Sequence, residues 1–155
     1  MTATNHALTG AIIGLSITNP FLAVPLSVAS HFAQDAIPHF SVDPKRDVVS
    51  SWLPKLLVVD LSLCVALAVL LIVLRPPHWQ LACICGFGAT SPDLMWVKKF
   101  IHARQTGEIV HSTALIPRFH SRIQWFTKPI GIAVEIVWAI GASLVLAALI
   151  HLKRT

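Results

Sequence analysis

Three side chains of types that bind metal ions lie four residues apart in the stretch SHFAQDAIPHF, residues 30–40. They are His31, Asp35 and His39. Residues four apart share one face of a helix, so His31 and Asp35 would present an imidazole and a carboxylate side by side. These groups are ligands of divalent ions such as zinc. Because such pairs also form plain hydrogen bonds, and because His39 would serve equally as a helix cap or a solvated residue, the spacing leaves a structural interpretation open.

Other ionisable residues stand out because their surroundings are apolar. His6 precedes an apolar stretch, and Asp93 follows a proline in SPDLMW. Because proline bends a helix, we expect Asp93 to point into the bundle toward His31 and Asp35; a helix-capping aspartate is the alternative. Asp60 and Glu135 lie inside long apolar runs. An ionised carboxylate in the middle of a bilayer costs about 2.5 kcal/mol or more. These acids must therefore face inward and find partners, and a buried metal ion would be one.

Composition indicates an integral membrane protein made of helices in a single domain. Hydrophobic residues make up 55% and charged residues 12% of the 155 residues, whereas soluble domains carry about 25% charged residues. In a membrane protein, basic residues first of all indicate which side of the membrane a segment faces. The net charge of +5 is therefore read as a sign of topology and not of nucleic-acid binding. The cysteines, Cys64, Cys83 and Cys85, lie in apolar runs and are predicted to be core residues.

Three segments are apolar enough to cross a bilayer, which takes roughly 20 residues: 56–74, 79–97 and 130–152. Residues 7–37 are predicted to form a short, partly re-entrant helical hairpin with a turn at Asn19-Pro20; one long helix kinked at the proline is the alternative. Gly10 and Gly14 would let another helix approach closely. We expect no removable signal peptide, because a basic segment does not precede the first apolar stretch.

Basic residues predict the orientation. Of the 12 lysines and arginines, nine fall on one side of this topology, which the positive-inside rule assigns to the cytoplasm, together with segment 98–128. At about 1.5 Å per residue, Asp60, Asp93 and Glu135 lie roughly 7–11 Å from that boundary. The three acids form one layer, although the topology follows from the lysines and arginines alone. The nine are Lys45, Arg46, Lys55, Lys98, Lys99, Arg104, Arg118, Arg122 and Lys128.

The stretches NHALTGAIIGL, SHFAQDAIPH and SPDLMW resemble the LexA-binding family of bacterial inner-membrane metal-dependent hydrolases. An early histidine, a Ser-His-x-x-x-Asp helix and a Pro-Asp motif recur in that family. The pattern is also similar to zinc-dependent phospholipases C and single-strand zinc nucleases. The family's HRGxTHS stretch has no counterpart, and HSTALIPRFHS supplies only His111 and His120. The resemblance implies an inner-membrane location, zinc, and the candidate metal ligands His6, His31, Asp35, Asp93, His39 and His120.

These observations lead us to expect hydrolysis of a phosphoester, including a lipid-linked one, at the cytoplasmic edge of the membrane. Glu135 or Asp60 would orient a ligand or act as base, and Arg118 and Arg122 would hold the phosphate. The alternative is a non-enzymatic membrane protein with a structural polar or metal cluster and a basic loop that binds a partner or anionic lipid. A haem or ion carrier is less favoured, because only His31 lies well inside an apolar segment. No specific nucleic-acid partner is predicted, and a homo-oligomer stays open.

Overall fold

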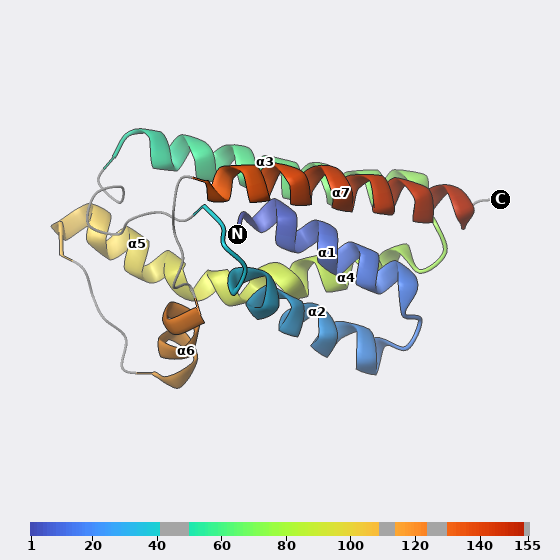
Figure 1. Ribbon diagram of the computed structural model, residues 1–155, viewed down its shortest axis with the longest axis horizontal. Helices are drawn as coiled ribbons and strands as arrows, with labels where there is room; N and C mark the ends of the chain where they lie inside the picture. Colours follow the sequence, from blue (N-terminus) through green and yellow to red (C-terminus); the bar gives the residue numbers. More distant parts are fainter. Residues whose placement is uncertain (41–49, 109–113, 124–129, 154–155) are drawn as a thin grey trace.

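The computed structural model describes residues 1–40, 50–108, 114–123 and 130–153, and these residues form helices and connecting segments without a β-strand. The all-helical prediction is confirmed for this part of the chain. Figure 1 shows an elongated bundle in which α3 and α7 lie along one side, α2 and α4 along the other, and α1 between them. The helices are α1 (Ala3–Ser16), α2 (Pro20–Asp35), α3 (Trp52–Leu74), α4 (Trp79–Thr90), the short 3₁₀ helix η1 (Ser91–Asp93), α5 (Leu94–Thr106), α6 (Leu115–Ile123) and α7 (Gly131–Leu152).

The first two helices form an antiparallel pair, because the chain between them leaves the helical conformation. Ile17 and Asn19 have extended backbone, and Asn19 caps α2 by accepting a hydrogen bond from the backbone N–H of Phe21. Pro20 occupies the first turn of α2, where its missing N–H costs nothing. With 14 and 16 residues, both helices are shorter than the roughly 20 residues needed to cross a bilayer.

Glycines set the close contact between α1 and α4. A Cβ atom added at Gly10 would lie 2.3 Å from the carbonyl oxygen of Cys85, and one at Gly14 would lie 2.6 Å from the Cα of Ala82. No side chain fits at either position. The helix that meets the predicted small-residue face is therefore α4, and this contact anchors α1 in the centre of the bundle.

Two helices are long and apolar enough to cross a membrane. They are α3, with 23 residues, and α7, with 22 residues. Their most apolar windows are only 6% and 17% buried, respectively, whereas the core helix of a soluble protein would be mostly covered. Large apolar side chains such as Val58, Val73 and Val137 are exposed on them. This surface suits a lipid environment better than water.

The predicted third span, 79–97, is not a single helix. The α-helix α4 ends at Thr90, Pro92 lies in η1, and α5 starts at Leu94. The reason is the proline, which lacks a backbone donor and tightens the chain into a 3₁₀ turn. Three membrane-spanning helices are thus not confirmed. Of the predicted cytoplasmic segment 98–128, residues 109–113 and 124–129 lie outside the described part of the chain, as do the basic residues Lys45, Arg46 and Lys128.

A groove of about 910 Å³ lies between α1, α3 and α7. Apolar side chains dominate its lining, and the small residues Ala66, Ser143 and Ala147 hollow it out. Thr4 and His151 are among its few polar lining residues.

Candidate metal centre

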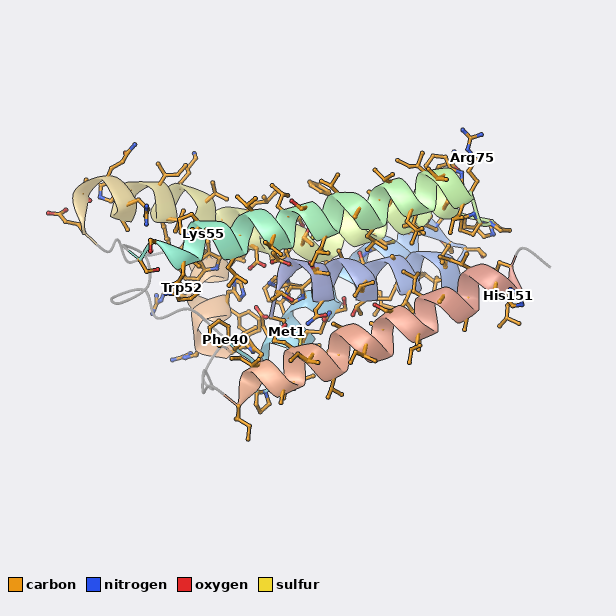
Figure 2. All side chains as sticks on the ribbon, turned by 90° about the horizontal axis from the view of Figure 1, so that it is seen from above. Met1, Phe40, Trp52, Lys55, Arg75 and His151 are labelled. Carbon is orange, nitrogen blue, oxygen red and sulfur yellow. The ribbon has the colours of Figure 1, made fainter. Side chains whose placement is uncertain are left out.

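Polar residues gather at one end of the bundle, where α1 starts, α2 ends, η1 interrupts the α4–α5 path and α6 docks (Figure 1). In the view of Figure 2, Met1 lies between the ribbons of α3 and α7. Phe40 and Trp52 are near the same end, and Arg75 and His151 are at the far end. Segments far apart in the sequence therefore meet in one place: 89 residues separate His31 from His120, and 133 separate Thr2 from Glu135.

The carboxylate of Asp35 is the centre of this cluster and is almost fully buried. Its Oδ2 lies 2.5 Å from Nε2 of His120 and 3.3 Å from Nε2 of His31. Its Oδ1 faces the N-terminal amine of Met1 and lies 3.3 Å from Nε2 of His6. The carboxylate thus brings together α1, α2 and α6.

Asp93 joins the cluster from η1. Its Oδ1 lies 3.7 Å from Nε2 of His31, as expected from a proline kink that turns this carboxylate into the bundle. Ligand atoms of His31, Asp35, Asp93 and His120 all lie within 4.8 Å of one another. Ligand distances to zinc are near 2 Å, so a single ion between these atoms would reach all four residues after small side-chain adjustments.

Two of the histidines are held in the tautomer that suits a metal ligand. Nδ1 of His31 donates to the carbonyl oxygen of Ala89 at 2.8 Å, and Nδ1 of His39 donates to that of Ile37 at 2.7 Å. A carbonyl only accepts, so the Nδ1 atoms carry the protons and each Nε2 atom has a lone pair; that of His31 lies 3.2 Å from Nε2 of His120. Such carbonyl contacts orient metal-binding histidines.

His39 is fully buried, so its predicted solvated alternative is wrong. It lies beyond the end of α2, with Nε2 3.9 Å from Oδ1 of Asp35. Gly131 makes this possible, because a Cβ there would lie 2.1 Å from the carbonyl carbon of His39. The first residue of α7 must therefore be small for His39 to reach the cluster.

His120 has a different hydrogen-bonding state. Nε1–H of Trp96 donates to Nδ1 of His120 at 3.3 Å, so the neutral ring carries its proton on Nε2 and donates it to Asp35. Binding a metal through Nε2 would require the proton to move to Nδ1 and the Trp96 contact to break. The sequence gives no signal for this contact, because residue spacing does not report that α6 packs against α2 and reaches Trp96 of α5.

His6 has no such anchor. Its ring stacks on that of His31, with centroids 4.0 Å apart, and neither ring nitrogen has a hydrogen-bond partner among the described residues. Burial lowers the pKa of His6 to about 4, against the opposing effect of Asp35, so the imidazole is neutral at pH 7. Burial acts to raise the pKa of Asp35, but the surrounding histidines outweigh it and hold that pKa below its ordinary range. A neutral imidazole beside a carboxylate is a suitable donor set for a cation.

Asp60 and Glu135, the predicted orienting groups or bases, bind the first turn of α1. Asp60 accepts from the backbone N–H groups of Ala3 and Thr4, and Glu135 accepts from Thr2 and Asn5. Sequence spacing gave no signal for the parts played by Thr2, Thr4 and Asn5.

Arg118 and Arg122 are exposed on α6, the helix that carries His120. Nothing in the described segments ties them to the cluster directly, so their phosphate-binding role stays a prediction.

Comparison of the chain with family models, with curated proteins and with solved structures gives no match. The class of protein therefore follows from its fold and its candidate site. In its described residues the chain is all-helical, with two helices long and apolar enough to cross a membrane and a largely buried His/Asp cluster that could hold a metal ion.

Proposed function

We propose that the protein is a metal-dependent hydrolase of the bacterial inner membrane that acts on a phosphoester at the cytoplasmic edge. The observation that carries the proposal is the convergence of His31, Asp35, Asp93 and His120, whose ligand atoms lie within 4.8 Å of one another. Burying several ionisable groups together is costly unless they are paired or bind a metal. A metal site explains why these groups are buried together better than core packing does.

Zinc is the ion we propose, because two imidazoles and two carboxylates match its usual ligands. His6 and His39 would complete or support the set, since Nε2 of each lies within 3.9 Å of the Asp35 carboxylate. When bound, the ion would polarise a phosphoryl oxygen and lower the pKa of water toward about 7. The chain's own contribution is to exclude bulk water, since the three histidines His6, His31 and His120 are fully buried.

A lipid phosphoester is the substrate class we favour. The groove between α1, α3 and α7 has walls from both candidate membrane spans, so hydrocarbon rather than water would fill it. Thr4 lines this groove and is two residues from His6. An acyl chain in the groove would bring its headgroup to the end of the bundle where the cluster lies. Arg118 and Arg122, on the helix of His120, would then bind the phosphate.

Three membrane crossings remain part of the proposal. In Figure 1, α3 and α7 run in the same direction, and α4 returns on the other side of α1 toward the end that carries α5 and α6. If both α3 and α7 cross the bilayer, the chain from α4 into η1 must cross back. The kink at Pro92 is tolerated in a membrane where protein satisfies the freed backbone groups.

The test is hydrolysis by protein purified in mild detergent. We expect zinc-dependent release of phosphate-containing headgroup from phosphatidylglycerol or phosphatidylethanolamine, its loss on chelation, and its recovery on adding zinc. The same preparation should act less well on a soluble phosphodiester such as bis(p-nitrophenyl) phosphate. Zinc-loaded protein that cleaves neither substrate would contradict the hydrolase assignment.

A second candidate is a non-enzymatic membrane protein, and the hydrogen bonds of His120 favour it. Trp96 donates to His120, and His120 donates to Asp35, which makes a connected polar core without an ion. Removing bound metal would then leave the thermal unfolding temperature unchanged. A metal centre would instead lose stability on chelation, since ligands that bind only the native state stabilise it.

A further inference from the structure

Each of the two candidate membrane spans places a carboxylate against the N-terminus of α1. From α3, Asp60 accepts from the backbone N–H of Ala3 at 2.8 Å and from that of Thr4 at 2.9 Å; the Thr4 hydroxyl adds a bond of 2.5 Å. From α7, Glu135 accepts from the backbone N–H of Thr2 at 3.1 Å and from its hydroxyl at 3.0 Å. These groups belong to different helices, so they fix the start of α1 to both of them.

These bonds replace the cap that α1 lacks. The first N–H groups of a helix have no partner within the helix, and a negative charge near them is favourable. The residue before α1, Thr2, makes no side-chain capping bond to the helix. The amide of Asn5 also donates to Glu135, at 2.6 Å to Oε2 and 3.1 Å to its backbone oxygen. The next residue along the chain is His6.

The position of His6 depends on this arrangement more than that of the other histidines. His31 and His39 each have a carbonyl partner that fixes the ring, whereas both ring nitrogens of His6 lack one within the described residues. In the part of the chain that the structure describes, the backbone of α1 and the stacking on His31 hold the ring against Asp35. Anything that shifts the first turn of α1 must therefore move His6.

We infer that Asp60 and Glu135 are positioning residues that hold α1, and through it His6, in the metal site, and that neither is its general base. The inference rests on the proposed function, and it chooses between the two roles that the sequence leaves open for these acids. It also gives a reason for carboxylates inside helices that otherwise suit the membrane: their partners are backbone and side-chain donors of α1 rather than lipid.

Zinc affinity of detergent-purified protein, measured by competition with a chromophoric chelator, tests the inference. Replacing Glu135→Ala or Asp60→Ala should weaken zinc binding by at least about 10-fold, the usual loss when the support of a ligand is removed. Glu135→Gln keeps an oxygen acceptor but cannot act as a base, so it should retain both zinc affinity and hydrolysis. Ser62→Ala on α3 and Val137→Ala on α7 are the controls, because the Ser62 hydroxyl donates to Val58 of its own helix and Val137 is exposed, outside both the cluster and the groove.

A second measurement does not depend on metal. The hydroxyl of Thr4 lies 4.0 Å from Sγ of Cys64, so Thr4→Cys should form a disulfide with Cys64 under diamide when Cys83 and Cys85 are replaced by alanine. Adding Glu135→Ala should lower the yield of this cross-link, and adding Glu135→Gln should restore it. If the unaltered protein binds no zinc, the proposed function fails, but the cross-link still decides whether Glu135 holds α1.

Three results would overturn the inference. Zinc affinity unchanged in both alanine variants would remove the link between the acids and the site. Glu135→Gln that binds zinc fully but no longer hydrolyses the substrate would make Glu135 a base. A cross-link yield that Glu135→Ala leaves unchanged would show that the start of α1 is held by something else.

Discussion

Nε2 of His120 lies 2.5 Å from Oδ2 of Asp35, although 85 residues separate them in the chain. The contact joins α6 to the end of α2 and closes one side of the cluster. Trp96 belongs to the same chain of hydrogen bonds, because its indole N–H donates to the other ring nitrogen of His120. His120 therefore donates its Nε2 proton to Asp35, and Nε2 can bind a metal ion only after the proton has moved to Nδ1.

Replacing Trp96→Phe should strengthen zinc binding. The indole N–H favours the tautomer that cannot bind a metal through Nε2, and one hydrogen bond contributes about 1 kcal/mol, or roughly 5-fold in affinity. Competition with a chromophoric chelator measures the change. Trp138→Phe is the matched control, because it removes a bond of the same type, from indole to the hydroxyl of Thr9, away from the cluster. Weaker binding in Trp96→Phe would mean that His120 does not bind the ion through Nε2.

Replacing Gly10→Ala should destabilise the protein. The new Cβ would lie 2.3 Å from the carbonyl oxygen of Cys85, so α1 and α4 would have to separate, and overpacking of this kind costs about 1–3 kcal/mol. Gly141→Ala is the control, because its Cβ would meet nothing within 4 Å and alanine favours a helix by up to about 1 kcal/mol. Thermal unfolding in detergent should rank Gly10→Ala below and Gly141→Ala at or above the unaltered protein. Equal unfolding temperatures would show that α1 and α4 are not in close contact.

Reporter fusions should place positions 47 and 110 on the cytoplasmic side and position 155 on the other. Nine of the 12 lysines and arginines fall on one side of the three-span topology, which gives this orientation. Alkaline phosphatase and green fluorescent protein fusions report opposite sides and serve as controls for each other. A cytoplasmic signal at position 155 would rule out three crossings.

Local spacing and charge predicted the parts of the site that depend on single segments. The four-residue spacing put His31 and Asp35 on one face of α2, and the SPD motif predicted a kink that turns Asp93 toward them. Both α3 and α7 were recognisable because a run of about 20 apolar residues has few alternatives to a long helix.

The remainder of the site depends on how distant segments pack. The packing of α6 brings His120 to Asp35 and to Trp96. Nothing in the residue spacing around these three positions indicates this packing. The partners of Asp60 and Glu135 were also missed, because half of the donors are backbone N–H groups, which every residue but proline carries, and the others are ordinary threonine and asparagine side chains. Hydropathy alone does not register the 3₁₀ turn at Pro92, so a third span over residues 79–97 is not confirmed as a single helix.

The central claim, a metal centre built around Asp35, is tested most directly by the metal content of protein purified in mild detergent from zinc-supplemented cells. Elemental analysis should find zinc bound to the unaltered protein, and His31→Ala and Asp35→Ala should each bind zinc at least about 10-fold more weakly. His102→Ala, a change of the same type on α5 outside the cluster, should keep the full amount. Unaltered protein without metal, or His31→Ala and Asp35→Ala variants that retain all of it at limiting zinc, would contradict the account.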